Sequence, residues 1–180
     1  MRVFFGIEPD PAACQTIADW RDRYGIAAGR PVPSANFHIT LAFVGDVSDR
    51  QLETLCTAVD ERQDGDAFVA GELELDLVGF WPGAGIYWMG ASQPPRQLAA
   101  LARKLQHLGG LVGARLQKKP FTPHVTLYRN CSDPPPAPAV PPKIDLDYTY
   151  LTLFESKPGR EGVSYHALAQ WDLTPASGLP

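Results

Sequence analysis

Residues 38–41 read HITL and residues 124–127 read HVTL, so one tetrapeptide occurs twice in a chain of 180 residues. Each copy lies in an apolar run that alternates with period two, which is typical of a β-strand. The two copies start 86 residues apart, close to half the chain length. An internal repeat at this spacing predicts two similar lobes that each contribute one motif strand.

Alternation along a strand places every second side chain on the same face. His38 therefore shares a face with Thr40, and His124 shares a face with Thr126. We expect both polar faces to line one cleft between the lobes. In the first strand, the expected core face carries Phe37, Ile39, Leu41 and Phe43, and the other face carries His38, Thr40 and Ala42.

The duplicated His and Thr suit one kind of chemistry. Histidine, with an ordinary pKa near 6.5, exchanges protons at neutral pH, so two histidines on opposite walls serve as base and acid in one displacement. Two β-branched hydroxyls supply oriented hydrogen-bond donors. Together they fit a tetrahedral anion attacked in line, which indicates cleavage of a phosphodiester without a metal ion.

Other interpretations of the motif are weaker. A single copy is most simply an amphipathic strand, but two matched copies reverse that preference. Two histidines are one or two ligands short of a metal site, and no HxxxH or nearby carboxylate completes them. The sequence has no GxSxG nucleophile elbow and neither of the two glycine-rich nucleotide motifs, GxGxxG and GxxxxGK[ST].

Arg129 lies five residues after His124, so strict alternation would place it on the opposite face. A bend after Tyr128 is needed to aim it at the cleft, where its planar guanidinium suits a phosphate. His107 and His166 lack the threonine partner, and we assign them structural roles. Five aromatic residues are candidates for stacking on a base, although most strand aromatics are core: Phe5, Phe80, Trp81, Trp88 and Tyr165.

Periodicity and capping signals predict the remaining elements. Strands are expected at 2–8, 37–43, 68–80, 85–90, 122–129, 144–154 and 163–171, and helices at 11–24, 49–63 and 94–108. Residues 26–36 and the proline-rich 134–142 are expected to be loops, the latter unusually long for a connector. The later strands follow one another without crossover helices, so we predict an α+β fold with antiparallel sheets.

Composition sets wider limits. The 44% hydrophobic and 20% charged residues are typical of a globular protein, and we expect one domain over residues 1–180. The net charge of −4 argues against wrapping long nucleic acids but allows a local anion site. Three separated cysteines without CxxC indicate core thiols. No apolar run suits a signal peptide or a membrane span, which predicts a cytoplasmic protein without membrane partners.

With these motifs assembled, the chain resembles the two-histidine (2H) phosphoesterases. Within that superfamily it is most similar to the RNA 2′,3′-cyclic phosphodiesterases, historically called 2′-5′ RNA ligases. The resemblance covers nearly the whole chain and few families share the complete pattern. It is carried by the segments 2–5, 36–45, 121–129 and 155–165.

The resemblance implies a bilobal fold of two pseudo-symmetric lobes, with antiparallel sheets around a central cleft and helices on the outside. By similarity, His38 protonates the leaving 3′ oxygen and His124 activates water. Thr40, Thr126 and Arg129 would then bind the phosphate. The resemblance implies no metal and no cofactor, and a monomer whose partners are RNA ends or nucleotide cyclic phosphates.

Three functions remain open from the sequence. The leading one is hydrolysis of RNA 2′,3′-cyclic phosphate ends to 2′-phosphate ends, with reversible 2′-5′ ligation of RNA as a minor activity. The second is a phosphodiesterase for small cyclic phosphates or 2′-5′ oligonucleotides, which would use the same residues. The third is a non-catalytic module that binds RNA ends through the anion pocket.

Overall fold

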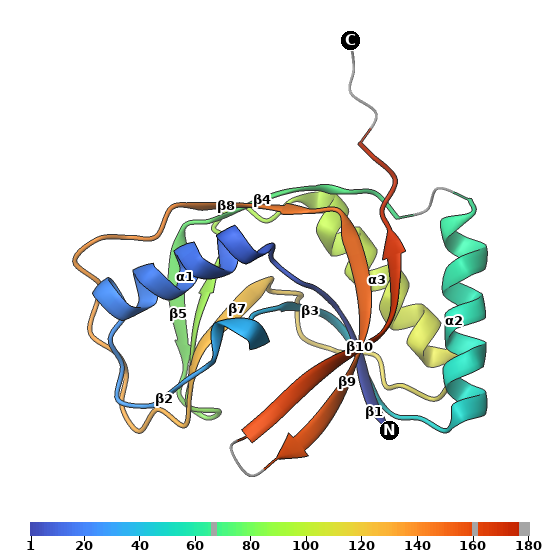
Figure 1. Ribbon diagram of the computed structural model, residues 1–180, viewed down its shortest axis with the longest axis horizontal. Helices are drawn as coiled ribbons and strands as arrows, with labels where there is room; N and C mark the ends of the chain where they lie inside the picture. Colours follow the sequence, from blue (N-terminus) through green and yellow to red (C-terminus); the bar gives the residue numbers. More distant parts are fainter. Residues whose placement is uncertain (66–67, 160–161, 177–180) are drawn as a thin grey trace.

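The computed structural model describes residues 1–65, 68–159 and 162–176 and contains two sheets and three α-helices (Figure 1). The helices are α1 (Pro11–Tyr24), α2 (Asp49–Gln63) and α3 (Arg96–Gly110). The strands are β1 (Arg2–Ile7), β2 (Arg30–Pro31), β3 (Ile39–Asp46), β4 (Gly71–Leu75), β5 (Leu77–Trp81), β6 (Ile86–Gly90), β7 (His124–Arg129), β8 (Ile144–Tyr148), β9 (Tyr150–Gly159) and β10 (Gly162–Asp172).

The larger sheet has the strand order β10-β9-β1-β3-β7-β6-β5, and β2 pairs with β7. Strands β4 and β8 form a separate two-stranded sheet. Every pairing between these strands is antiparallel. Antiparallel sheets combined with three α-helices confirm the α+β prediction. In Figure 1, α1 lies on one side of the molecule, and α2 and α3 lie on the other.

The helix boundaries follow from their capping residues. The Asp10 side chain accepts a hydrogen bond from Ala13 N at 2.7 Å at the start of α1, and Gly25 caps the other end of this helix. Ser48 and Gln51 form a reciprocal capping box that begins α2. These side chains satisfy backbone N–H groups that have no partner within the helix, which is why both predicted starts are confirmed.

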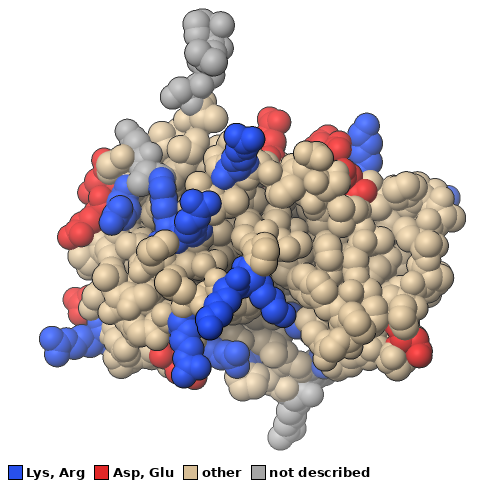
Figure 2. All heavy atoms as spheres, turned by 180° about the vertical axis from the view of Figure 1, so that it is seen from behind, with Lys and Arg blue, Asp and Glu red and all other residues tan. Residues whose placement is uncertain are grey.

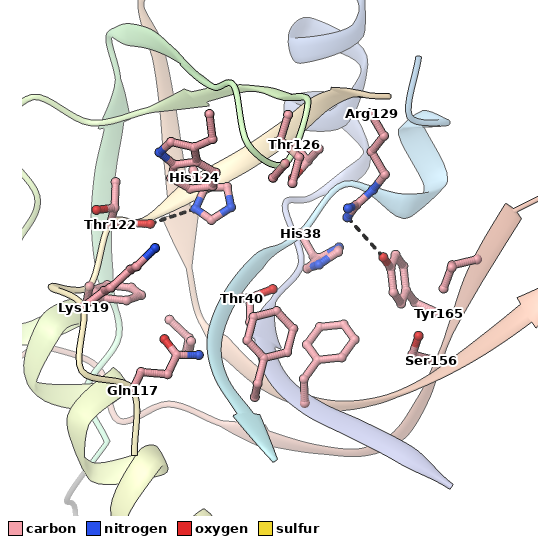
Figure 3. A pocket seen from close by; sticks show the side chains of 18 of the residues that line it. His38, Thr40, Gln117, Lys119, Thr122, His124, Thr126, Arg129, Ser156 and Tyr165 are labelled. Atoms are coloured by element: carbon pink, nitrogen blue, oxygen red, sulfur yellow. Dashed lines mark hydrogen bonds between the residues drawn. The ribbon is translucent and has the colours of Figure 1, made fainter. Parts of the chain in front are cut away.

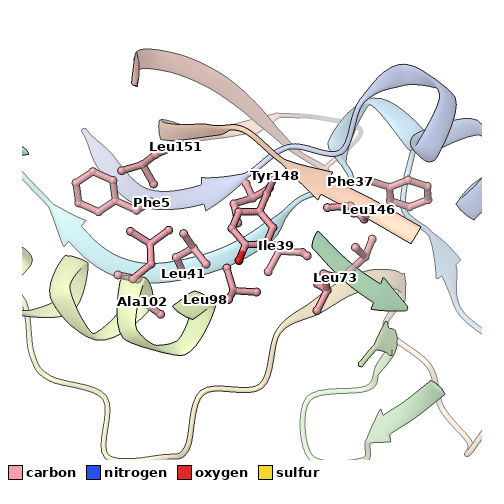
Figure 4. Close-up of a cluster of buried hydrophobic side chains, with 14 of the residues drawn as sticks. Phe5, Phe37, Ile39, Leu41, Leu73, Leu98, Ala102, Leu146, Tyr148 and Leu151 are labelled. Atoms are coloured by element: carbon pink, nitrogen blue, oxygen red, sulfur yellow. The ribbon is translucent and has the colours of Figure 1, made fainter. Parts of the chain in front are cut away.

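The hydrophobic core joins the large sheet, α3 and the small sheet (Figure 4). Helix α3 presents its apolar stripe to β3, so that Leu98 and Ala102 pack in the same buried cluster as Leu41. Leu73 and Leu146 contribute the inner face of the small sheet. This packing buries one face of β3 in the core and leaves its other face for the site.

Two predicted strands are wrong in extent. The expected strand 68–80 breaks at Asp76, whose carboxylate accepts hydrogen bonds from the backbone N–H and the hydroxyl of Ser92. The expected strand 144–154 breaks at Thr149, whose carbonyl accepts from Leu173 N. In each case one strand serves the small sheet and the next serves the large sheet, a change of partner that periodicity does not register.

Smaller differences concern the loops and the thiols. Residues 26–36 include the short strand β2 and a 3₁₀ turn at Ser34–Asn36, in addition to loop. The proline-rich segment 134–142 connects β7 to β8 without a regular element, as predicted, and the indole of Trp20 donates to Val140 O at 3.2 Å. Cys131 is buried as expected, whereas Cys14 and Cys56 are only partly buried.

Candidate active site

The two motif strands meet at the centre of the large sheet. Ile39 of β3 pairs with Val125 of β7, and this is the register pair that joins the two halves of the sheet. Because the pairing is antiparallel, the residue before Ile39 lies opposite the residue after Val125, and the residue after Ile39 lies opposite the residue before Val125. His38 is thereby set toward Thr126, and Thr40 is set toward His124.

All five residues proposed from the sequence line one pocket of about 1000 Å³ (Figure 3). His38 precedes β3 directly, and Thr40 follows within that strand. His124, Thr126 and Arg129 all belong to β7. The structure therefore brings the two halves of the repeat together on one surface.

The two imidazoles have the same hydrogen-bond arrangement. Nδ1 of His38 lies 2.8 Å from the carbonyl oxygen of Asn36, and Nδ1 of His124 lies 2.8 Å from the carbonyl oxygen of Thr122. A carbonyl only accepts, so Nδ1 carries the proton and donates it in both rings. Each neutral ring consequently keeps the lone pair of Nε2 for chemistry.

Aromatic rings surround His38. Its ring centroid lies 5.0 Å from that of Phe4 and 4.6 Å from that of Tyr165, with the Tyr165 ring approached edge-on. Burial among these groups lowers the pKa of His38 to about 4, and the positive charge of Arg129 acts in the same direction.

His124 has a matching environment on β7. Its ring centroid lies 4.6 Å from that of Trp81 and 5.9 Å from that of Trp88, and both contacts are edge-on. Burial again lowers the pKa of this imidazole, and Arg129 contributes to the shift. Both histidines are therefore neutral at pH 7, which makes each a potential base.

A β-bulge directs Arg129 into the pocket. On β7, Leu127 has no partner on β6, because Trp88 pairs with Thr126 and Tyr87 pairs with Tyr128. The extra residue reverses the alternation beyond it. The bend that the sequence required for Arg129 thus occurs one residue earlier than expected.

An equivalent bulge on β3 makes one predicted core residue face the pocket instead. Leu41 has no partner on β1, because Gly6 pairs with Thr40 and Phe5 pairs with Ala42. Beyond this bulge, Ala42 is buried and Phe43 is 55% exposed and lines the pocket. The prediction of Phe43 as a core residue is wrong, and Phe43 occupies the position in the first motif that Arg129 occupies in the second.

The guanidinium of Arg129 is held near His38 by one tyrosine. Its Nη2 donates to Tyr165 Oη at 3.5 Å, and the same tyrosine ring contacts His38. Tyr165 belongs to β10, so the end of the chain contributes to the pocket (Figure 3). A phosphate bound between the histidines would meet this cation.

Of the aromatic residues considered for stacking, Trp81 and Tyr165 line the pocket and Phe5 is fully buried. His107 and His166 lie outside the pocket lining: His107 bonds to Arg103 O on α3, and His166 contacts the Ser164 hydroxyl.

The sequence reasoning missed several lining residues, among them Arg2, Gln117 and Lys119. The basic run QKK at 117–119, shortly before the second motif, is the signal that could have indicated two of them. Within residues 1–65, 68–159 and 162–176, no group of three or more His, Cys, Asp or Glu is placed to hold a metal ion. None of the helices in this described part has the length and hydropathy needed to span a bilayer.

Comparison with known proteins agrees with the geometry. A family model described as LigT-like phosphoesterase matches residues 7–87. The RNA 2′,3′-cyclic phosphodiesterase of Escherichia coli (strain K12) is 36% identical over 177 residues, covering 96% of this chain and 97% of that protein. A protein of the same name from Aeropyrum pernix is 30% identical over 103 residues, which is 56% of each chain.

Solved structures extend the match to the whole fold. E. coli LigT complexed with 3′-AMP superposes with a TM-score of 0.84 at 34% identity, covering 96% of this chain and 98% of that one. The ATP complex of the same protein gives a TM-score of 0.82 at 32% identity, covering 96% and 98%. In these two structures, E. coli LigT is complexed with the nucleotides 3′-AMP and ATP. The near-complete match to the E. coli enzyme shows that this chain belongs to the LigT-like phosphoesterases, a family of 2H phosphoesterases.

Proposed function

We propose that this protein hydrolyses the 2′,3′-cyclic phosphate at the end of an RNA chain and leaves a 2′-phosphate. One observation carries the proposal: two histidines with the same Nδ1-bound tautomer line one pocket together with two threonines. The names of the curated relatives agree with this activity. The reaction needs a base, an acid and a clamp for the phosphate, and the pocket offers each of them.

In the proposed reaction, Nε2 of His124 takes a proton from water while the water oxygen attacks phosphorus. The bond from phosphorus to the 3′ oxygen breaks, and Nε2 of His38, protonated before the step, donates its proton to that oxygen. Thr40 and Thr126 donate to the non-bridging oxygens, and Arg129 offsets their charge. The products are a 2′-phosphomonoester and a free 3′-hydroxyl.

The electrostatics of the pocket set a condition on this division of work. Burial lowers the pKa of His38 to about 4, so an anionic substrate is needed to favour its protonated form. Once protonated, a histidine with a low pKa is a strong acid and releases its proton readily. Burial also lowers the pKa of His124, so this ring is neutral before the step and its lone pair can accept the proton of water.

Turnover of an oligoribonucleotide with a 2′,3′-cyclic phosphate end in the presence of EDTA tests the proposal. We expect undiminished turnover, because both proton-transfer groups are imidazoles. We expect H38A and H124A to lower kcat by roughly 10²- to 10⁴-fold, the usual worth of a positioned acid or base. Loss of activity in EDTA that zinc or manganese restores would contradict the mechanism.

The pH dependence of the two variants separates their roles. If His124 is the base, H124A loses the acidic limb of the kcat/KM profile, whereas H38A loses the basic limb. H107A is the matched control, since His107 lies on α3 outside the pocket lining. We expect H107A to keep both limbs and the rate of the original protein.

We further propose that the protein acts as a monomer in the cytoplasm on RNA ends. All five candidate side chains come from one chain, which supports the monomer. Light scattering across the concentration range of the activity assay tests it. A dimer mass at assay concentrations would contradict the proposal.

A further inference from the structure

The pocket carries cationic or amide groups at two ends. In Figure 3, Arg129 and Tyr165 lie on one side of the His38 imidazole. Lys119 and Gln117 extend into the pocket on the opposite side, from the segment between α3 and β7. The proposed reaction uses the groups at the Arg129 end and leaves Lys119 and Gln117 without a role.

The charges of the pocket exceed what one cyclic phosphate needs. Among the described residues, the lining includes Arg2, Lys119 and Arg129 and no carboxylate, whereas a cyclic phosphodiester carries one negative charge. Arg129 and the two threonines already face that charge. The pocket therefore has positive charge left over, in a chain whose net charge is −4.

The two remaining cations differ in their surroundings. Arg2 stands opposite Asp46 in the β1–β3 pairing, which places a carboxylate at the neighbouring position of the strand pair. Lys119 has no ion pair and no hydrogen bond with any residue that the structure describes. Lys119 is thus the better candidate for an anion that arrives with the substrate.

Alternate residues of the segment 117–119 line the pocket. Gln117 and Lys119 both line it, and Lys118 between them does not. An ammonium group and a side-chain amide are two donors suited to phosphate oxygens. Figure 2 shows that Lys and Arg also gather around a hollow on one face of the molecule.

We propose that Lys119 and Gln117 form a second phosphate subsite, which binds an internucleotide phosphate of the RNA whose cyclic end is hydrolysed. The proposal rests on the proposed function and names its substrate class as an oligonucleotide. The pocket volume of about 1000 Å³ lies at the upper end of the roughly 300–1000 Å³ that small-molecule sites occupy, which leaves room beyond one nucleotide. The subsite contacts the backbone and therefore reads no sequence.

Two substrates and two variants test the subsite. The substrates are uridine 2′,3′-cyclic phosphate and a uridine trinucleotide with a 2′,3′-cyclic phosphate end. We expect the original protein to prefer the trinucleotide, and K119Q to reduce the ratio of the two kcat/KM values roughly two- to fivefold, the range for one exposed ion pair. K118Q is the matched control and should keep the ratio.

Salt dependence gives an independent readout. For the trinucleotide, log(kcat/KM) should fall with log salt concentration, and K119Q should make that slope shallower by about 0.7, the contribution of one phosphate in a single strand. K118Q should leave the slope unchanged. This readout does not depend on how the mononucleotide behaves.

The outcomes separate the subsite from the proposed function. If the original protein hydrolyses neither substrate, the proposed function itself fails. If it hydrolyses both but K119Q leaves the ratio unchanged, Lys119 either belongs to the reacting phosphate or binds no phosphate, and the subsite is wrong. A changed ratio with K119Q and an unchanged ratio with K118Q supports it.

Discussion

The hydroxyl groups of Thr40 and Thr126 have no hydrogen-bond partner among the residues that the structure describes. Thr126 is nearly buried and Thr40 is partly exposed, and both line the pocket. A β-branched side chain has few rotamers in a strand, so each hydroxyl is held in place without an intramolecular bond. This leaves both donors for a ligand.

We expect T40V and T126V each to lower kcat/KM for a cyclic-phosphate oligonucleotide by roughly 10- to 150-fold, since a hydrogen bond to a charged acceptor is worth about 1.5 to 3 kcal/mol. Valine keeps the shape and removes the donor. The pH of maximal activity should stay the same, because the histidines set it. Unchanged kcat/KM in both variants would remove the threonines from the phosphate clamp.

The histidines predict a pH-dependent affinity for anions. Burial lowers the pKa of His38 to about 4 and also lowers the pKa of His124, so the two rings bind fewer protons than ordinary imidazoles would at the same pH. A bound anion favours the protonated rings, and its binding therefore takes up protons. We expect sulfate, a dianion throughout this range, to bind more tightly as the pH falls from 7 to 5.

Calorimetric titration with sulfate at pH 5, 6 and 7 measures this linkage. The double variant H38Q/H124Q is the control, because glutamine does not titrate and its sulfate affinity should stay constant over this range. Tighter binding at pH 7 than at pH 5 in the original protein would contradict the direction of the linkage.

The matched bulges at Leu41 and Leu127 explain why strand periodicity succeeded for four site residues and left the fifth open. Up to the threonine of each motif, the period of two holds, so His38, Thr40, His124 and Thr126 share the pocket face. Past the bulge the faces exchange. No local signal in either motif marks the bulge, because leucine fits a bulged and a regular strand equally well.

The capping box of α2 offers a stability change separate from the site. We expect S48A to lower the free energy of unfolding by about 1 kcal/mol, the usual cost of losing an N-cap side chain. Helix α2 contributes no residue to the pocket lining, so kcat should not change. Urea denaturation and the activity assay on the same sample measure both, and a fall in kcat would show that α2 communicates with the pocket.

The arrangement of whole strands was harder to predict than their existence. The chain leaves the small sheet for the large one at Asp76 and again at Thr149, so strand partners change where hydrophobic alternation continues. Lys119 lies in an irregular segment, and only the tertiary fold brings it to the pocket. Contacts between distant segments are the part that local pattern does not contain.

The continuous core predicts that the two lobes unfold together. One buried cluster includes Phe5 of β1, Leu41 of β3, Val125 and Leu127 of β7, and Leu73 of the small sheet. We expect one thermal transition, with the calorimetric enthalpy equal to the van't Hoff enthalpy. Two resolved transitions, or a calorimetric enthalpy well above the van't Hoff value, would mean that residues 1–180 form two domains.

The pairing of Ile39 with Val125 relates the two motifs by an approximate twofold axis. Each half sets its histidine toward the threonine of the other half, the reciprocity found in an isologous contact between two identical subunits. The proposed site therefore belongs to the contact and to neither lobe. A half-chain that carried one motif would regain both proton-transfer groups only by associating with a second copy about the same axis.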